Sequence, residues 1–306
     1  MFSISTVWNA YRHASAEAMI EELSASGCEA IELSFTLPAE LFPGVLDLAR
    51  AGRVKVSSLH NYCPPPLVPR SGRLDPDLPS LASRDERERS WAVRQTMRTI
   101  DAAKAMKARA VVLHLGKIPL REAGRKIIDL AMEDGDERRR RELRDFFLRK
   151  RAKKAGPHLE GVFRSLLSLT AYAEGTGVLL GVENRYFLEE IPSLDEIGAI
   201  FDRIPSPALG YWHDIGHAQV KENVGLEEHG EYLRRYGGRL IGMHIHDVIG
   251  ASDHRAPLQG RFDFTRVKDY LRRDILKVFE IHPPATDEEV RRGIEHILHL
   301  SGGSIT

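Results

Sequence analysis

A carboxylate and an imidazole lie three residues apart in the stretch Gly210-Tyr211-Trp212-His213-Asp214-Ile215-Gly216-His217. A carboxylate at the end of a buried strand is unfavourable by several kcal/mol unless a positive group pairs with it. This stretch contains no Lys or Arg. We therefore expect a divalent metal ion beside Asp214, and we expect His217, just over the turn, to face the same pocket.

Other strand-like runs also end in residues that bind metals. These residues are His60, His114, Glu183, His244 and Glu280, with His254 in a loop beyond. A single His at the end of a strand is more often a hydrogen-bonded core or rim residue, so the prediction depends on the whole set. Several buried carboxylates in one pocket repel one another unless a cation lies among them. The set therefore predicts a metal site.

Positioning these residues requires an alternation of strands and helices, and the hydrophobic pattern predicts one. Ser15, Ser193 and Thr286, the last with Glu289, are expected N-caps. The eight expected strands are residues 2–7, 30–35, 54–60, 110–115, 178–183, 208–214, 240–246 and 277–281. This order predicts a single α/β domain, residues 1–306, folded as a (β/α)8 TIM barrel, in which chemistry collects at the C-terminal ends of the strands. A doubly wound sheet is the alternative, but no Gly-x-Gly-x-x-Gly follows the first strand.

Residues 117–158 are longer than a barrel loop requires, so we expect a helical insertion after the fourth strand. Within it, Asp136–Lys154 is rich in Arg and Lys with Leu and Phe between them. This pattern predicts one or two extra helices whose basic face is solvated. Gly156-Pro157 predicts the start of a separate helix that runs to about residue 175.

Composition excludes several classes of protein. The 306 residues contain 44 Lys and Arg and 44 Asp and Glu, so the net charge of zero does not favour binding to nucleic acid or to an anionic membrane. No apolar run approaches the ~20 residues of a spanning helix, and we find no signal peptide. With Cys28 and Cys63 as the two cysteines, we expect a reducing, cytoplasmic location. The sequence does not decide whether the chain forms a homo-oligomer. Residues 117–158 are the natural place for a contact between subunits.

Alternation along the strands separates the remaining histidines. Because neighbours on a strand point to opposite faces, we expect His213 to point away from Asp214. By the same rule His246 shares a face with His244 and is expected to support it. We expect His229 to lie at the surface.

Four short motifs carry a resemblance to a known family, and they are Val182-Glu183-Asn184, Asp214-Ile215-Gly216-His217, His244-Ile245-His246-Asp247 and Phe279-Glu280. With them, the chain resembles the xylose-isomerase-like barrel superfamily, which includes sugar isomerases, sugar epimerases and the endonuclease IV nucleases. The resemblance covers nearly the whole chain outside 117–158. It implies one divalent metal ion held by Glu183, Asp214, His244 and Glu280. It also implies that Glu183 and Glu280 form the catalytic acid/base pair.

The resemblance leads to a first functional hypothesis, a metal-dependent isomerase or epimerase of a sugar or sugar phosphate. A Mn²⁺, Mg²⁺ or Zn²⁺ ion would polarise the substrate carbonyl. One glutamate would remove the adjacent proton to give a cis-enediolate, and the other would return it. His217 would hold a substrate hydroxyl, and the pocket would be lined by His60, His114, Asn184 and Trp8. Arg185, Arg255 and Arg261 could meet a phosphate, although we expect them to form surface ion pairs.

The endonuclease IV branch implies an alternative function, a zinc-dependent phosphodiesterase acting on abasic DNA. That branch uses two further zinc ions at positions matching His60, His114, His217 and His254, together with an Asp two residues before the last His. Here that position is Ser252, and Asp253 is directly adjacent to His254. Neighbours on an extended strand diverge, so these two could share an ion only through a bend. The basic segment 138–154 would be the DNA contact. A third possibility is a barrel that binds a sugar or metal without catalysis.

Overall fold

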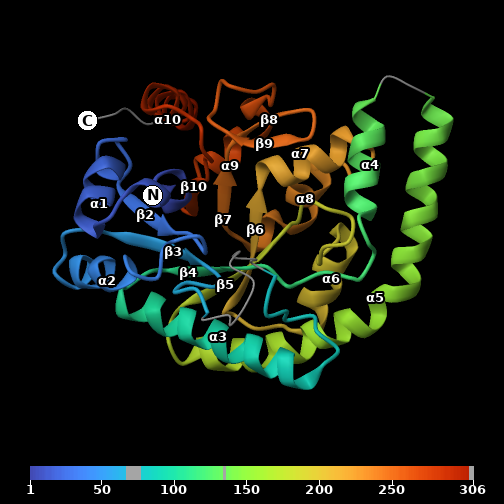
Figure 1. Ribbon diagram of the computed structural model, residues 1–306, viewed down its shortest axis with the longest axis horizontal. Helices are drawn as coiled ribbons and strands as arrows, with labels where there is room; N and C mark the ends of the chain where they lie inside the picture. Colours follow the sequence, from blue (N-terminus) through green and yellow to red (C-terminus); the bar gives the residue numbers. More distant parts are fainter. Residues whose placement is uncertain (67–76, 134–135, 303–306) are drawn as a thin grey trace.

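Eight parallel strands close into a barrel, which confirms the predicted fold class (Figure 1). The computed structural model describes residues 1–66, 77–133 and 136–302. The barrel strands are β1 (Phe2–Ser5), β2 (Ala30–Leu33), β3 (Val56–His60), β4 (Ala110–Leu113), β5 (Leu179–Glu183), β6 (Leu209–Asp214), β7 (Leu240–Ile245) and β10 (Leu276–Phe279). Their order around the barrel is β1-β10-β7-β6-β5-β4-β3-β2, so strands that follow one another in this series are neighbours in space.

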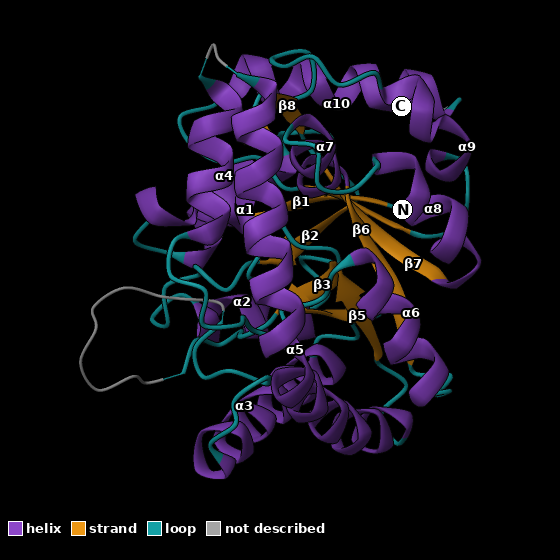
Figure 2. Cartoon of the chain, turned by 90° about the vertical axis from the view of Figure 1, so that its right-hand side faces the viewer, coloured by secondary structure: helices purple, strands orange, loops and turns teal. Residues whose placement is uncertain are grey.

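Helices surround the strands on the outside of the barrel (Figure 2). They are α1 (Ala16–Ser24), α2 (Phe42–Arg50), α3 (Glu86–Ala105), α4 (Ala123–Met132), α5 (Glu137–Glu174), α6 (Leu194–Arg203), α7 (Ile215–Asn223), α8 (His229–Tyr236), α9 (Lys268–Leu271) and α10 (Asp287–Ser301). The three predicted N-caps are confirmed. The hydroxyl of Ser15 accepts from Ala18 N–H, and Ser193 and Thr286 each form a full capping box. Within the described ranges, no helix has both the length and the apolar character needed to cross a membrane.

The inside of the barrel is packed below the strand ends. Trp212 is fully buried there and packs with Ala110, Val112, Leu276 and Val278. Its ring requires neighbours without side chains, because a Cβ atom on Gly242 would lie 2.2 Å from the indole and one on Gly181 would lie 3.1 Å from it. The Trp212 ring contacts His244 edge to face, with centroids 5.2 Å apart. Trp212 thus forms a rigid floor under the strand ends, where the polar residues collect.

The insertion after β4 consists of α4 and α5, as predicted, but the predicted helix start at Gly156-Pro157 is wrong. Both residues lie inside α5, which continues from Glu137 to Glu174. A proline inside a helix removes one hydrogen bond and bends the helix rather than necessarily ending it. Figure 1 shows the result, because α5 runs beside α4 and then turns to lie along α3. Burial of apolar residues after the bend, including Val162, Leu166 and Leu169, holds the second half in place.

The basic residues of α5 are mostly exposed, as expected for a solvated face, but Arg151 is an exception. Its guanidinium is buried and forms two hydrogen bonds of 2.7 Å with the carboxylate of Glu196. Arg151 also donates to the backbone carbonyls of Leu188 and Glu190. It therefore fastens the insertion to the loop that follows β5.

An antiparallel hairpin that the sequence did not predict follows β7. It consists of β8 (Asp247–Ile249) and β9 (Ser252–Arg255), with an irregularity in their pairing. Asp247 organises the segment behind it, because its carboxylate accepts from the backbone N–H groups of Leu258, Gly260 and Phe262. The hairpin carries Asp253 and His254 over the open end of the barrel.

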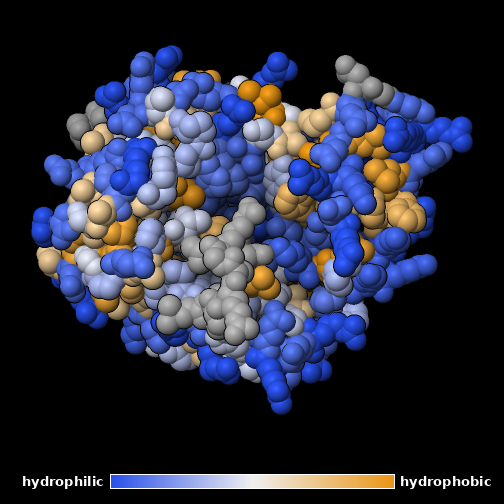
Figure 3. Space-filling model, viewed as in Figure 1, coloured by the Kyte–Doolittle hydropathy of each residue, from blue (hydrophilic) through white to orange (hydrophobic). Residues whose placement is uncertain are grey.

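Figure 3 shows hydrophobic residues at the surface over α4 and α5, on the right of the view. Exposed apolar side chains of this region include Met132, Phe146 and Leu148. This is the segment in which we expected a subunit contact, and the homo-oligomer stays a prediction.

Candidate metal centre

Four side chains from four strands converge at the C-terminal end of the barrel. Glu183 ends β5, Asp214 ends β6, His244 lies in β7, and Glu280 directly follows β10. One potential ligand atom from each lies within 4.8 Å of the others, and all four residues are buried. The structure therefore brings together the four residues that the sequence analysis named as metal ligands.

The imidazole of His244 lies at the centre of this group. Its Nδ1 atom is 2.7 Å from Glu183 Oε1, 3.1 Å from Glu280 Oε2 and 3.5 Å from Asp214 Oδ2. Burial favours the neutral ring, but the negative charges of Glu280 and Glu32 raise the pKa of His244 well above its usual value. The protonated imidazole thus offsets part of the negative charge of the three carboxylates. A cation bound among them would take the place of that proton.

The three carboxyl groups are held in their ionised form. Burial alone would raise the pKa of Glu183, but hydrogen bonds with His114 and His244 hold it well below its usual range. The pKa values of Asp214 and Glu280 are likewise lowered against the effect of burial, chiefly by the charges of neighbouring histidines. Three buried carboxylates and one imidazole are a ligand set that suits Mn²⁺ or Mg²⁺ and also admits Zn²⁺. The residues present therefore fit a divalent ion.

Glu32 of β2 is a buried member of the site that the sequence analysis missed. Its Oε1 atom lies 3.1 Å from His244 Nε2, and its Oε2 atom accepts from the Ser58 hydroxyl at 2.8 Å. A carboxylate on one ring nitrogen of a histidine directs the other nitrogen toward a metal. Glu32 therefore orients Nδ1 of His244 toward the three carboxylates. In the sequence, Glu32 is marked by being an acidic residue inside the apolar run Ala30–Leu33. The prediction considered only residues at the ends of strands.

Asp214 is positioned by the backbone and by Asn184. Its Oδ1 atom caps α7 by accepting from His217 N–H at 2.7 Å, and its own N–H donates to Asn184 Oδ1. Asn184 Nδ2 donates in return to the carbonyl of Asp214, and Tyr211 donates its hydroxyl to Asn184 Oδ1. The Asn184 amide is thus used to orient a ligand, and its expected role in substrate binding stays a prediction.

His213 points away from the metal centre, as alternation along the strand predicted. Its two ring nitrogens lie 2.7 Å from the Tyr211 hydroxyl and 3.1 Å from His229 Nε2. The surface position expected for His229 is wrong, because α8 buries its ring against His213 and stacks it on Phe262. Burial, together with the charge of Arg266, lowers the pKa of His229 to about 4.

Two of the further ligand groups among the described residues flank the four central residues. On one side His60 and His114 approach Glu183, with His114 Nε2 at 2.9 Å and His60 Nε2 at 3.9 Å from Glu183 Oε2. On the other side His217 and His254 approach Asp253, at 3.8 Å and 3.0 Å. The backbone of His254 adopts a positive φ of 55°, which supplies the bend that two adjacent ligands need. Each trio has ligand atoms within 4.8 Å of one another.

Arg185 is part of the site, and the surface ion pair expected for it is wrong. The residue is 5% exposed. Its Nη1 atom donates to Glu183 Oε2 at 2.6 Å and also contacts His114, while Nη2 donates to Glu190 Oε1 at 3.0 Å. Arg255 and Arg261 are exposed, as expected.

Trp8 lies in a different environment from the carboxylates. Its indole N–H donates to the carbonyl of Ala285 at 3.0 Å, and the Arg12 guanidinium lies over its ring. The hydrogen bond joins the N-terminal segment to the loop before α10. That Trp8 lines the substrate pocket stays a prediction.

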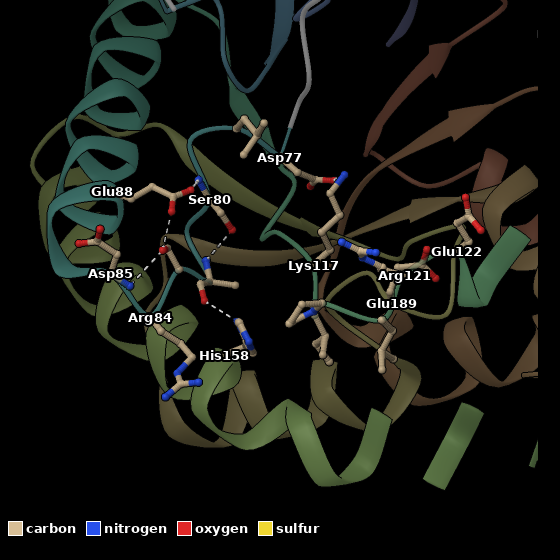
Figure 4. Close-up of a pocket in the computed structure, with 16 residues that line it drawn as sticks. Asp77, Ser80, Arg84, Asp85, Glu88, Lys117, Arg121, Glu122, His158 and Glu189 are labelled. Carbon is tan, nitrogen blue, oxygen red and sulfur yellow. Dashed lines mark hydrogen bonds and ion pairs between the residues drawn. The ribbon is translucent and has the colours of Figure 1, made fainter. Parts of the chain in front are cut away.

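A cavity of about 630 Å³ lies beside the barrel end, between α3, the segment after β4 and the middle of α5 (Figure 4). Charged residues of both signs line it, among them Arg84, Glu88, Lys117, Arg121 and Glu189. Asp77, one of its lining residues, has its carboxylate 3.9 Å from His114 Nδ1.

A parallel (β/α)8 barrel with acidic residues and histidines at its C-terminal strand ends defines a class of protein, and sequence comparison identifies the family. Residues 20–299 match the family described as xylose isomerase-like TIM barrel, and the chain belongs to it. The protein y4fM of Sinorhizobium fredii is 33% identical over 109 residues, and the chain spans about a third of the length of this curated relative.

Several solved structures share the fold. A D-tagatose 3-epimerase-like protein superposes with a TM-score of 0.68 at 19% identity, covering 98% of both chains. The 3-keto-D-glucoside 4-epimerase YcjR of E. coli gives 0.66 at 13% identity, over 97% of this chain and 98% of the other. The D-psicose 3-epimerase of Clostridium cellulolyticum H10, solved with D-tagatose, gives 0.66 at 13% identity over 98% of both chains. At these identities the similarity establishes the fold.

Proposed function

We propose that this protein is a divalent-metal-dependent isomerase or epimerase of a sugar or sugar phosphate. The observation that carries the proposal is the convergence of Glu183, Asp214, His244 and Glu280 on one buried point. Two of these four residues are glutamates, which gives the site both an ion-binding set and a pair of groups able to move a proton. The superposed structures named as sugar epimerases support the same class of substrate.

A bound divalent ion would be held by these four residues and would supply electrophilic polarisation of a substrate carbonyl. The protein's own groups do the remaining work. Both glutamates are ionised in the resting site, so either can accept a proton from the carbon next to the carbonyl. The second glutamate, which is also ionised, first takes up a proton from solvent water and then delivers it to the neighbouring carbon or to the opposite face. Trp212 closes the floor of the barrel and excludes water from below.

Exchange with solvent tests this proposal. The protein is loaded with Mn²⁺ and incubated with a panel of free and phosphorylated ketoses in deuterated water, and the sugars are examined by proton NMR. We expect deuterium at the carbon beside the carbonyl of at least one sugar. Absence of exchange across a broad panel, with the metal shown to be bound, would refute the proposal.

The flanking ligand groups favour a second candidate, a zinc phosphodiesterase acting on abasic DNA. The trios His60, His114, Glu183 and His217, Asp253, His254 would add ions on either side of the central four residues. Several ions side by side suit the displacement of a phosphate ester. The net charge of zero disfavours this second function, because binding to duplex DNA depends on contacts of Lys and Arg with phosphates. Cleavage of an abasic oligonucleotide by the zinc-loaded protein, but not by Glu280→Gln, would establish this activity, and intact DNA would exclude it.

A further inference from the structure

The guanidinium of Arg185 is held between two buried carboxylates. Nη1 donates to Glu183 Oε2 at 2.6 Å, and Nη2 donates to Glu190 Oε1 at 3.0 Å. Glu190 is itself fixed, since its Oε2 accepts from Phe187 N–H at 2.7 Å and its carbonyl accepts from Arg151. Arginine keeps its positive charge in proteins. A permanent positive charge is therefore anchored beside Glu183.

The Arg185 guanidinium contacts the atoms that a flanking metal ion would need as ligands. An ion bound by His60, His114 and Glu183 would sit about 2.0–2.2 Å from each ligand atom. The oxygen available to it is Glu183 Oε2, which lies 2.9 Å from His114 Nε2. Arg185 Nη1 contacts both of these atoms. The guanidinium and an ion cannot occupy the same space, and their charges repel.

The two oxygens of Glu183 consequently have different partners. Oε1 lies 2.7 Å from His244 Nδ1, at the centre of the four converging residues. Oε2 faces Arg185 and the two flanking histidines. One oxygen is thus available to the central ion, while the other is taken by an arginine.

We propose that Arg185 replaces a metal ion at the flanking position, so that His60 and His114 are not metal ligands in this protein. The inference rests on the proposed function only in requiring a metal at the central four residues. The centre then binds one ion fewer than its ligand groups would hold. His60 and His114 become free to face substrate, and Arg185 supplies the positive charge beside Glu183 Oε2.

Counting bound ions tests the replacement. The purified protein and its variants are saturated with Zn²⁺, desalted and measured by elemental analysis, with circular dichroism as a check on folding. We expect His114→Ala to bind as many ions as the unchanged protein. Arg185→Ala is expected to gain one ion per chain, and adding His114→Ala to it should remove that ion again. Arg185→Lys keeps a positive charge and is expected to leave the count unchanged.

Two outcomes would overturn the inference. One is a His114→Ala protein that binds one ion fewer than the unchanged protein. This result decides the question even if Arg185→Ala does not fold. The other is an Arg185→Ala protein that folds and binds no additional ion. Asp214→Asn separates this inference from the proposed function, because it should remove the central ion. If the ion counts behave as expected but no sugar exchanges deuterium, the proposed reaction fails and the role of Arg185 stands.

Discussion

At the scale of single residues, the site combines ion binding and proton transfer in the same carboxylates. Glu183 contacts both His244 and Arg185, so its charge is balanced from two sides. Replacing it with glutamine keeps the shape and removes the base. We expect Glu183→Gln to lower solvent exchange by about 10²–10⁴-fold, the usual contribution of a general base. Glu280→Gln should behave similarly.

The measurement is the rate of deuterium incorporation under saturating metal, so that weaker ion binding does not dominate. Glu228→Gln is the matched control, because Glu228 is exposed and lies outside the metal centre. Exchange by Glu183→Gln at the rate of the unchanged protein would remove Glu183 from the reaction.

Glu32 acts through His244 and is a positioning residue. Its carboxylate accepts from His244 Nε2, which leaves Nδ1 directed at the ion. Loss of such an outer partner typically weakens metal binding by about 10–100-fold. We expect this loss in Glu32→Gln when Mn²⁺ binding is followed by calorimetry, with folding unchanged. Equal affinity in the variant and the unchanged protein would show that Glu32 does not orient the ligand.

At the scale of elements, a buried ion pair between Arg151 and Glu196 ties the insertion to α6. Arg151 and Glu196 form a two-pronged contact, and neither residue is exposed by more than 8%. Removing one partner of a buried pair leaves the other charge unpaired, which is destabilising by about 3–5 kcal/mol. We expect Arg151→Ala to lose that much unfolding free energy in urea. The exposed Arg149→Ala should lose no more than about 0.5 kcal/mol. Equal losses of unfolding free energy in the two variants would contradict the stabilising role of the Arg151–Glu196 pair.

At the scale of the whole molecule, buried neutral histidines link stability to pH. The pKa of His229 is lowered to about 4, below the usual value of about 6.5. At pH 5 the unfolded chain therefore binds a proton that the folded chain does not, and stability falls as the pH drops from about 6.5 toward 4. For His229 alone, we expect a loss of roughly 2 kcal/mol between pH 7 and pH 5.

Denaturation of His229→Phe at both pH values measures this contribution, because phenylalanine keeps the stacking on Phe262. The variant should lose about 2 kcal/mol less than the unchanged protein over this interval. The exposed His299→Gln is the control and should lose as much as the unchanged protein. If His229→Phe loses as much unfolding free energy between pH 7 and pH 5 as the control does, His229 does not link stability to pH.

The barrel and the ligand residues at strand ends were predictable because both depend on local patterns, whereas the family resemblance selected four of the six strand-end residues as one ligand set. Apolar runs mark strands, and Glu183, Asp214 and Glu280 end or directly follow such runs. Other features depend on contacts between distant segments. The burial of Arg185 requires Glu190, and the continuity of α5 through Pro157 requires packing on both sides of the bend. The approach of Asp253 and His254 to His217 requires a left-handed residue in a hairpin that the hydrophobic pattern does not mark.

The central claim is that Glu183, Asp214, His244 and Glu280 hold one divalent ion. Anomalous X-ray diffraction from crystals grown with Mn²⁺ tests it most directly. We predict an anomalous peak about 2.0–2.3 Å from one oxygen or nitrogen atom of each of the four side chains. A Mn²⁺ peak elsewhere, or no peak while the four side chains lie as described, would contradict the claim.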